Sequence, residues 1–292
     1  FLKLTSLVSN NKAFVQRSRI AVLVCLFPWL LALGLRFRLR NTSLLNLRFN
    51  FLGTTKQAHK LFSVYLILVS GLIFIFSWYF YCFIINSAAA ASNFEVSSVL
   101  LLMFFALQAY VFIYPLFVCD LRMFMVNKAI FGDEKFTARL SRAGFVSGFV
   151  KAVLLFICIL CLVTGIGVGM FWSAQVSSLE LNTFAIALFT LGTYFGFSLV
   201  TIIPNAYWQV FIFNETFASM ELAGQVRFNA NLNTKTLAVL LITNALMVLL
   251  SLGFAYPWAA IRLAKYKLEA ISYAGDLSAF EGHSKAHTNA LG

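Results

Sequence analysis

Long runs of apolar residues follow one another along most of this chain. A helix needs about 20 apolar residues to cross the hydrocarbon core of a bilayer, and in lipid its backbone polar groups must be satisfied within the segment. Five runs meet that length and a sixth, at the start of the chain, is shorter. The runs are Leu61–Ile85, Val96–Cys119, Phe145–Trp172, Thr183–Phe213, Leu237–Ile261 and, shortest, Ile20–Leu35. We therefore expect an all-α membrane protein with about six hydrophobic helices.

The composition agrees with a bilayer environment. Of 292 residues, 61% are hydrophobic and 11% are charged, whereas roughly 25% are charged in an ordinary soluble domain. All five tryptophans lie toward the ends of the runs, where an indole ring prefers the headgroup boundary. They are Trp29, Trp78, Trp172, Trp208 and Trp258. A multi-pass membrane protein is the class that fits.

The basic residues are concentrated in two connections. Residues 36–60 carry six basic residues and no acid, and residues 120–144 carry five basic residues against three acids. The short connections 86–95 and 173–182 each carry a single acid. The positive-inside rule places the two basic connections on the cytoplasmic side. Because these charges adjoin the runs, anionic lipid headgroups are the expected partner, and nucleic acid is not.

The four prolines share one setting. Each lies toward the C-terminal end of an apolar run, and the ninth residue after each is aromatic. Proline inside a spanning helix removes a hydrogen bond and bends the helix. We expect kinks that direct the following basic residues toward the interface, where they can snorkel. The kink positions are Pro28, Pro115, Pro204 and Pro257.

A common order of elements follows three of these prolines. A basic or turn-rich stretch leads to "RFNFLGT", "KFTARLS" or "RFNANLN", and then to the next run. Alternation bounded by Gly or Asn predicts short strand pairs, here in cytoplasmic loops. We interpret the order as three repeated helical hairpins within a single membrane domain 1–292, covering about 20–85, 96–172 and 183–261, followed by a polar amphipathic tail 262–292. Three unrelated loops with similar turn chemistry are the alternative.

Two stretches share one pattern, which is an aromatic residue, Pro, Trp, six residues and then basic–aromatic–basic–Leu. They are "FPWLLALGLRFRLRN" at Phe27–Asn41 and "YPWAAIRLAKYKLEA" at Tyr256–Ala270. Tryptophan would anchor each at the headgroups and the basic residues would reach phosphates, at roughly 1 kcal/mol per residue on an anionic leaflet. Anchoring without lipid preference is the alternative. The interface candidates are Trp29, Arg36, Arg38, Arg40, Arg48, Trp258, Arg262, Lys265 and Lys267.

Both stretches also carry a family resemblance. "PWLLALGLRFRLRNTSLLNLRFNFLG" near the start, and "RFNANLNTKTLAVLLITNALMVLLSLGFAYPWAAIRLAKYKLEA" near the end, resemble the YjgN family of bacterial inner-membrane proteins, a domain of unknown function. The second match is stronger: its Leu252-Gly253, Tyr256-Pro257-Trp258-Ala259 and Arg262 with Lys265-Tyr266 resemble that family's closing signature. The resemblance implies an inner-membrane location and a multi-pass architecture, and it implies no activity.

Crossing by all six runs creates a conflict. The two Pro-Trp stretches would then end on opposite faces, and Arg262, Lys265 and Lys267 would lie outside, against the charge rule. A re-entrant run is one response, and Ile20–Leu35 is the candidate because it is short. That choice still leaves the C-terminal basic residues outside.

Small residues recur at the spacing that lets helices approach closely in lipid. Two such pairs lie mid-run in consecutive runs: Gly165 with Gly169 and Gly192 with Gly196. We expect them to pack these two helices together, with an oligomer interface as the alternative. A third pair, Gly144 with Gly148, lies where a run begins and is interpreted as a loop boundary.

Few side chains that could carry out catalysis lie inside the apolar runs. Lys151 is the one ionisable residue well inside a run, and the three histidines lie outside the runs. No metal site, cofactor or enzymatic activity is expected. The predicted function is an integral membrane protein that binds lipid or a membrane partner, which includes a second copy of itself. The alternative is a transporter or channel for a small or amphipathic solute.

Overall fold

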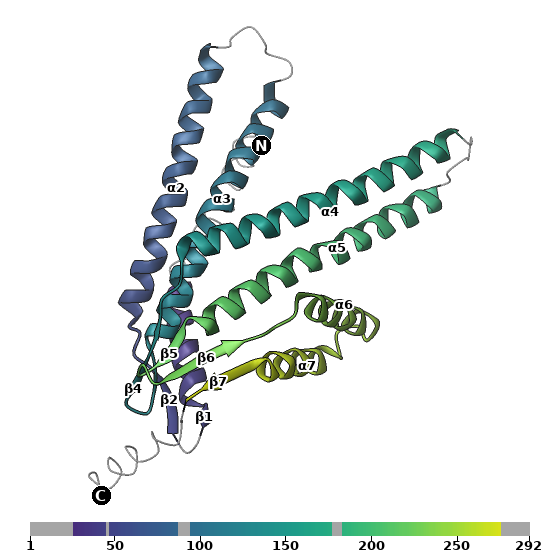
Figure 1. The fold of residues 1–292 in the computed structure, drawn as a ribbon. Helices are drawn as coiled ribbons and strands as arrows, with labels where there is room; N and C mark the ends of the chain where they lie inside the picture. Colours follow the sequence, from purple (N-terminus) through teal and green to yellow (C-terminus); the bar gives the residue numbers. More distant parts are fainter. Residues whose placement is uncertain (1–25, 45–46, 87–93, 177–182, 276–292) are drawn as a thin grey trace, which may run out of the picture. The chain divides into compact units, whose positions relative to one another are not determined.

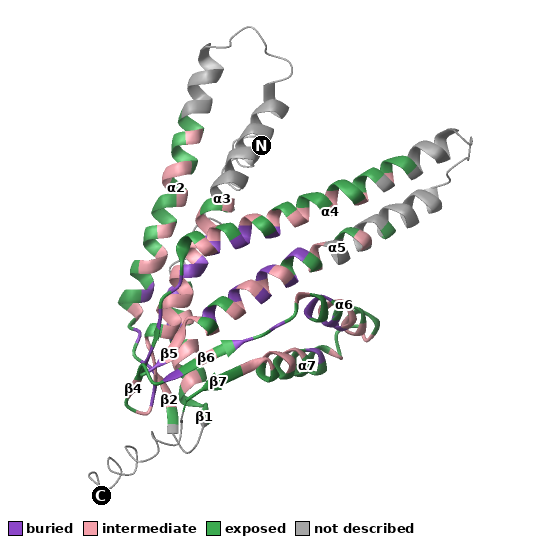
Figure 2. Cartoon of the chain, in the orientation of Figure 1, coloured by how far each residue is buried: buried purple, intermediate pink, exposed green. Residues whose placement is uncertain are grey.

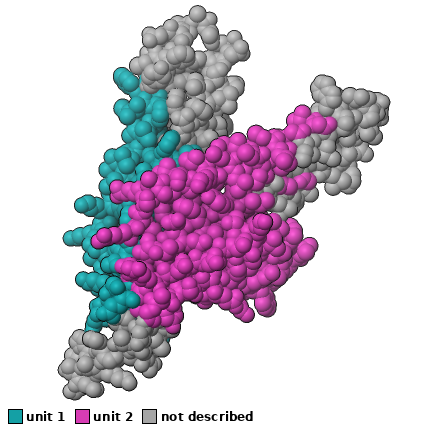
Figure 3. Space-filling view, viewed as in Figure 1, with its two compact units in different colours: residues 1–138, 222–225, 276–292 teal, residues 139–221, 226–275 magenta. Residues whose placement is uncertain are grey.

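A computed structural model describes residues 26–44, 47–86, 94–176 and 183–275 (Figure 1). The chain divides into two compact units (Figure 3). The first comprises Phe1–Ala138 with the turn Leu222–Gln225 and the segment Asp276–Gly292, and the second comprises Arg139–Glu221 and Val226–Gly275. Residues 20–25 of the expected run Ile20–Leu35 and residues 276–292 of the expected tail 262–292 lie outside the described residues.

The first unit is built from helices and a small antiparallel meander. A helix over residues 26–40 leads to β1 (Ser43–Leu44) and β2 (Leu47–Phe51), α2 (Thr55–Asn86) and α3 (Phe94–Asn127) follow, and β3 (Ala129–Phe131) and β4 (Glu134–Ala138) complete it. The strand order is β1-β2-β3-β4. Phe49 lies opposite Phe131 in the β2–β3 ladder, with ring centroids 4.8 Å apart. The two basic connections 36–60 and 120–144 therefore meet in one sheet.

The α2–α3 pair packs through aromatic rings near its strand end. Phe117 of α3 makes edge contacts with both Phe62 and Tyr65 of α2, at 5.0 and 5.2 Å between ring centroids. The Tyr65 hydroxyl also donates a 2.6 Å hydrogen bond to Oδ2 of Asp120. Pro115 lies inside α3 and is fully buried. The acid at this end of α3 is thus tied to the neighbouring helix.

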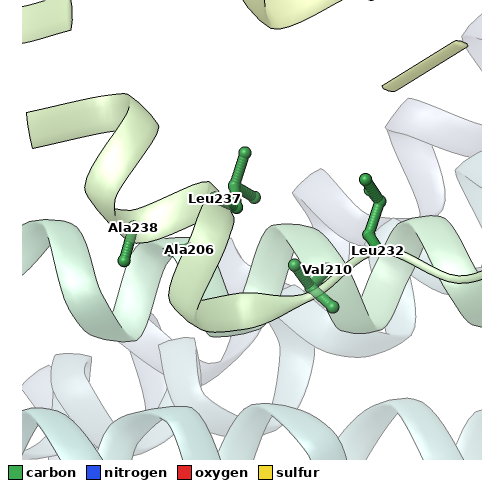
Figure 4. Packing of buried hydrophobic residues seen from close by; sticks show 5 residues of the cluster. All are labelled: Ala206, Val210, Leu232, Leu237 and Ala238. Carbon is green, nitrogen blue, oxygen red and sulfur yellow. The ribbon is translucent and has the colours of Figure 1, made fainter. Parts of the chain in front are cut away.

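The second unit holds α4 (Arg142–Val176), α5 (Thr183–Ala218), β5 (Met220–Leu222), β6 (Val226–Ala230), α6 (Thr234–Leu250), α7 (Tyr256–Glu269) and β7 (Ile271–Ala274). Its strand order is β5-β6-β7, and Pro204 lies inside α5. A cluster of buried residues joins α5 to the start of α6 (Figure 4). The cluster contains Ala206, Val210, Leu232, Leu237 and Ala238. This core fixes where α6 leaves the sheet.

Three helical segments are long and apolar enough to cross a membrane: Thr55–Trp78, Tyr110–Asn127 and Arg142–Gly169. Few of the described side chains in Thr55–Trp78 and Arg142–Gly169 are buried by protein, and in Arg142–Gly169 these lie near its start. Buried residues of α4 and α5 lie toward the ends that lead to the strands (Figure 2). Apolar helices that expose their length need lipid around them. The membrane class is thereby supported, while the count of six spans stays a prediction.

The strand pairs follow the sequence expectation. "RFNFLGT" begins within β2, "KFTARLS" within β4 and "RFNANLN" within β6, and each lies beside its preceding strand. Each proline-bearing helix leads directly to a strand. The helix over residues 26–40 leads to β1, α3 to β3, α5 to β5 and α7 to β7. The chain therefore orders helix, strand, strand, helix three times. The internal sequence repeat that this suggests stays a prediction.

An asparagine fastens the loop in two of these segments. The side-chain amide of Asn127 accepts from the Ala138 N–H at 2.7 Å and donates to the Ala138 carbonyl at 3.4 Å. Asn214 makes the same pair of bonds with Leu232, at 3.0 and 3.2 Å. Asn127 thus joins α3 to the end of β4, and Asn214 joins α5 to the segment just after β6.

The run Leu237–Ile261 differs from the expectation of one span. It is divided between α6, which ends at Leu250, and α7, which begins at Tyr256. Pro257 lies in the first turn of α7 and begins a helix there instead of kinking one, because a first-turn residue needs no intrahelical N–H donor. Four residues of β7 then pair with β6, from Arg227 opposite Ala274 to Ala230 opposite Ile271. The chain therefore returns to the sheet that it left.

Candidate lipid-interface site

The N-terminal basic stretch is held against the start of α2. Arg36 donates from Nη2 to the Gly53 carbonyl at 3.2 Å, and Arg40 donates from Nε to Oδ1 of Asn50 at 3.4 Å. Arg38 and Arg48 are exposed. Arg36 and Arg40 thus brace the helix over residues 26–40 against β2 and the turn after it, and Arg38 and Arg48 are exposed.

The aromatic part of that stretch lies at the other end of the same helix. Trp29 is exposed, whereas Pro28 beside it is buried. The ring of Phe27 makes an edge contact with Phe62 of α2, at 5.4 Å between centroids. From Trp29 to Arg36 is seven residues, which is about 10 Å along a helix. The exposed indole of Trp29 and the guanidinium groups that follow it therefore lie at different levels along the helix axis.

The C-terminal basic stretch forms α7, which has two unlike faces. Leu263, Tyr266 and Ala270 pack on the α5–α6 core, and Ala259 is buried. The opposite face exposes the side chains of Trp258, Ile261, Lys265 and Leu268. Large apolar side chains at spacings of three and seven residues make a continuous outward stripe. This stripe has protein on its inner side and none on its outer side among the described residues.

Polar bonds tie α7 to α6. Arg262 donates from Nη1 to Oγ1 of Thr243 at 3.1 Å and to Oδ1 of Asn244 at 3.4 Å. Asn244 is buried, and its Nδ2 donates to the Ala259 carbonyl at 3.1 Å. Nearer the sheet, the Tyr266 hydroxyl bonds both the N–H and the carbonyl of Asn233. The Arg262 guanidinium is thus positioned by a hydroxyl and an amide, neither of which neutralises its charge.

The two lysines differ in their surroundings. Lys265 lies 3.9 Å from Oε1 of Glu269, and both side chains are mostly exposed. An exposed pair of that kind contributes little, at most about 1 kcal/mol. Lys267 reaches Oε1 of Gln209 on α5 at 3.4 Å. Three basic residues against one acid leave α7 positive at the end that joins the sheet.

The arrangement matches the layers of a leaflet. On α7, exposed apolar residues begin at Tyr256, and the basic residues begin at Arg262. That step is six residues, or about 9 Å of helix. The aromatic end of α7 suits acyl chains, and its basic end suits phosphates.

Comparison with protein families returns one match, over residues 1–292, to the family described as bacterial protein of unknown function, DUF898. The chain belongs to this family. No curated protein and no solved structure matches it. Membership in DUF898 supplies no activity, so the roles of individual residues rest on the geometry of this chain.

The expected packing role of Gly165, Gly169, Gly192 and Gly196 stays a prediction. A Cβ built on Gly165, Gly169, Gly192 or Gly196 meets no atom within 4 Å. A Cβ on Gly148 would instead lie 2.6 Å from ring carbons of Phe211. The close approach of α4 and α5 therefore uses the glycine that was interpreted as a loop boundary. Among the described residues, the glycine that the structure shows at a close α4–α5 contact is therefore Gly148.

The polar groups that brace α7 were not singled out from the sequence. Thr243 and Asn244 lie within the run Leu237–Ile261. Two adjacent polar residues inside an apolar run are the feature by which the sequence could have identified them. In residues 26–44, 47–86, 94–176 and 183–275, no group of three or more His, Cys, Asp or Glu side chains is arranged to hold a metal ion. The candidate site of this DUF898 chain is thus a surface of basic and aromatic residues.

Proposed function

We propose that this DUF898 protein is a multi-pass inner-membrane protein, akin to the YjgN proteins it resembles, that binds anionic phospholipid at the basic ends of its interfacial helices. The observation that carries the proposal is the graded surface of α7. Trp258 and Ile261 are exposed on one face, and Arg262, Lys265 and Lys267 follow them toward the sheet. A phospholipid presents the same order, from acyl chain to phosphate.

The second support is the parallel design of the N-terminal stretch. Trp29 is exposed seven residues before Arg36, as Trp258 is seven residues before Lys265. The pairs sit in helices that both lead into strands, β1 and β7. Two stretches with the same sequence order and the same local structure are expected to meet the same chemical environment, which is the headgroup layer of the membrane.

Native mass spectrometry with mixed neutral and anionic lipids tests the proposal. Glutamine at Lys265 and Lys267 removes about 2 kcal/mol at roughly 1 kcal/mol per basic residue, which corresponds to a decrease of about 30-fold in the binding constant for anionic lipid. Adding glutamine at Arg36 and Arg38 should lower the preference further. Arginine at both lysine positions is the matched control, because it keeps the charge.

The outcomes separate lipid recognition from simple anchoring. The glutamine variants should lose their preference for anionic lipid while the arginine control retains it. A preference that persists unchanged in the fourfold glutamine variant would refute the proposal. Equal binding of neutral and anionic lipid by the natural protein would refute it as well, and it would leave generic anchoring as the role of these stretches.

Transport of a small or amphipathic solute is the second candidate. Pro115 and Pro204 lie inside α3 and α5, and interrupted spans are common where transporters bind substrates. The test is flux of labelled solutes into proteoliposomes, compared between the natural chain and Pro115→Ala with Pro204→Ala. Protein-dependent flux that these changes alter would favour transport over lipid binding.

A further inference from the structure

The α6–α7 pair leaves the sheet and returns to the same edge. Its two ends are held by the β6–β7 ladder, and the ladder is extended by a 3.0 Å hydrogen bond from the Asn231 N–H to the Ala270 carbonyl. Tyr266 and Asn233 add side-chain bonds at the same level. Wherever this sheet lies relative to the membrane, both ends of the pair lie there with it.

α7 is too short to cross a bilayer, and α6 is at the lower limit of length for a span. α6 has 17 residues and α7 has 14, which correspond to about 25 and 21 Å. The hydrocarbon core is about 30 Å thick and needs about 20 residues. A hairpin with both ends on one side and arms of this length can reach into one leaflet and turn back.

The turn between the helices exposes large apolar side chains. We define the α6–α7 tip as residues 249–258. Within it Leu250 is 84% exposed, Leu252 89% and Phe254 81%, and Trp258 is also exposed. No charged residue lies between Lys235 and Arg262. A turn in contact with water would be expected to be polar, and this one is not.

The backbone N–H groups in the middle of the tip are satisfied without water. Successive amides donate to acceptors inside the tip and the last turn of α6: Ser251 to Met247, Leu252 to Leu249, Gly253 to Val248, Phe254 to Ser251 and Tyr256 to Gly253, at 2.8–3.1 Å. The Ala255 N–H donates to the Ser251 side-chain oxygen at 2.9 Å. Pro257 follows and has no N–H. Internal pairing of every backbone N–H from Ser251 to Tyr256 is what lipid favours, because hydrocarbon offers these donors no other partner.

The chain accepts strain in order to make this turn. Leu252 has a φ of 51° and Gly253 a φ of 96°. The left-handed region is unfavourable for a leucine, and water could have satisfied a looser turn at no such cost. The Ser251 hydroxyl donates to the Val248 carbonyl at 3.1 Å while accepting from Ala255, so the one polar side chain of the turn is also turned inward.

Below the tip, polar groups hold the two arms together. Asn244 bonds the Ala259 carbonyl, and Arg262 bonds Thr243 and Asn244. Interhelical hydrogen bonds of this type stabilise helix pairs in lipid. The first charged residues on the two arms, Lys235 and Arg262, mark the level at which apolar surroundings must end. Charge and hydropathy along the hairpin thus follow the profile of a single leaflet.

We propose that the α6–α7 hairpin is a re-entrant element whose tip inserts into the acyl chains of the leaflet adjoining the sheet. The occupant of the tip surface is lipid. If α4 and α5 both cross the membrane, the proposal places Arg262, Lys265 and Lys267 on the same side as the basic connection 120–144, which satisfies the charge rule. It does not depend on a preference for anionic lipid, since acyl chains of any phospholipid satisfy it.

The experiment uses the full chain, with its five cysteines replaced, reconstituted in neutral phospholipid vesicles. Single cysteines at Leu250, Phe254 and Ser272 carry an environment-sensitive fluorophore. Quenching is measured with nitroxides placed on the acyl chain, with nitroxides on the headgroup, and with an aqueous quencher added outside or trapped inside. Ser272, in β7, is the matched reference at the base of the hairpin.

Labels at Leu250 and Phe254 should be quenched by acyl-chain nitroxides and protected from the aqueous quencher on both sides. The label at Ser272 should be quenched from water on one side. Aqueous quenching of Phe254 from the side opposite Ser272 would show a full crossing, and quenching from the same side would show a tip in water. Protection from lipid and water alike would show a protein partner. Each of these three results overturns the proposal.

A second variant guards against a misfolded reporter. Phe254→Asp in the chain labelled at Leu250 should reduce acyl-chain quenching, because an aspartate at the tip resists burial in hydrocarbon. Phe254→Leu should leave the quenching unchanged. Melting curves of both variants in detergent establish that they are folded. Equal quenching in the aspartate and leucine variants would contradict insertion even if the single-label results agreed with it.

Discussion

The packing of α4 against α5 predicts that Gly148→Leu destabilises the protein. Gly148 is buried, and a Cβ at this position would lie 2.6 Å from Cε1 and Cζ of Phe211, where ordinary contact begins at 3.4 Å. The ring of Phe211 is itself stacked on Trp208 at 5.7 Å and lies edge-on to Phe145 at 5.6 Å. It cannot withdraw by the missing distance of about 0.8 Å without moving those two rings.

Two contributions of opposite sign set the magnitude. Overpacking a close contact costs about 1–3 kcal/mol, with a leucine toward the upper end. Leucine is a better helix former than glycine by roughly 1 kcal/mol. The net loss in the free energy of unfolding is therefore about 1–2 kcal/mol. At Gly165, where a Cβ meets no atom within 4 Å, only the second contribution applies, and the same substitution should stabilise.

The assay is equilibrium unfolding in detergent micelles, followed by tryptophan fluorescence. Phe211→Ala combined with Gly148→Leu should recover part of the loss, since the smaller side chain vacates the space that leucine needs. The interaction energy of that cycle should be about 1–2 kcal/mol for residues in direct contact. Equal stability changes at Gly148 and Gly165, or an additive double variant, would refute the packing argument.

Two further predictions concern orientation and loop attachment. Cysteine introduced at Ser43 or Ala129 should resist a membrane-impermeant reagent applied outside the cell and react after permeabilisation, because both belong to basic connections that meet in the sheet; strong external labelling at either would reverse the orientation. Asn214→Leu should lower the free energy of unfolding by about 1–3 kcal/mol, because it leaves the backbone N–H and carbonyl of Leu232 without that partner. Asn205→Leu, at an exposed site on the same helix, is the control and should cost under about 0.5 kcal/mol. Similar losses in the two variants would contradict the role of the Asn214 amide.

The sequence predicted the helices and strand pairs well because both depend on local pattern. Run lengths marked α2 to α5, and the alternation in "RFNFLGT" marked β2. The division of Leu237–Ile261 could not be predicted that way, since its hydropathy continues across the turn. It depends on the left-handed backbone of Leu252 and Gly253 and on the pairing of β7 with β6, and the second of these joins residues more than forty positions apart.

The conflict over the C-terminal basic residues led to a sequence hypothesis that stays a prediction, because residues 20–25 lie outside the described part of the chain. That hypothesis made Ile20–Leu35 the re-entrant run because it was the shortest. In the structure the return to the sheet occurs between α6 and α7, within a run of ample length. Length bounds what a segment can span and does not say whether it turns. For the glycines, likewise, spacing says which residues share a helix face and not which neighbour that face meets, so Phe211 could not be matched to Gly148.

The strand order of the first unit has a consequence for how the protein is made. β1, β2, β3 and β4 pair in the order in which they are synthesised. Phe49 and Phe131 are far apart in sequence, yet the α2–α3 hairpin between them brings its two ends together once it is inserted. The cost of closing that loop is then borne by membrane insertion instead of by a search in water. Each strand can thus be added to the edge left by the one before while later spans are still on the ribosome, so that assembly proceeds in step with translation.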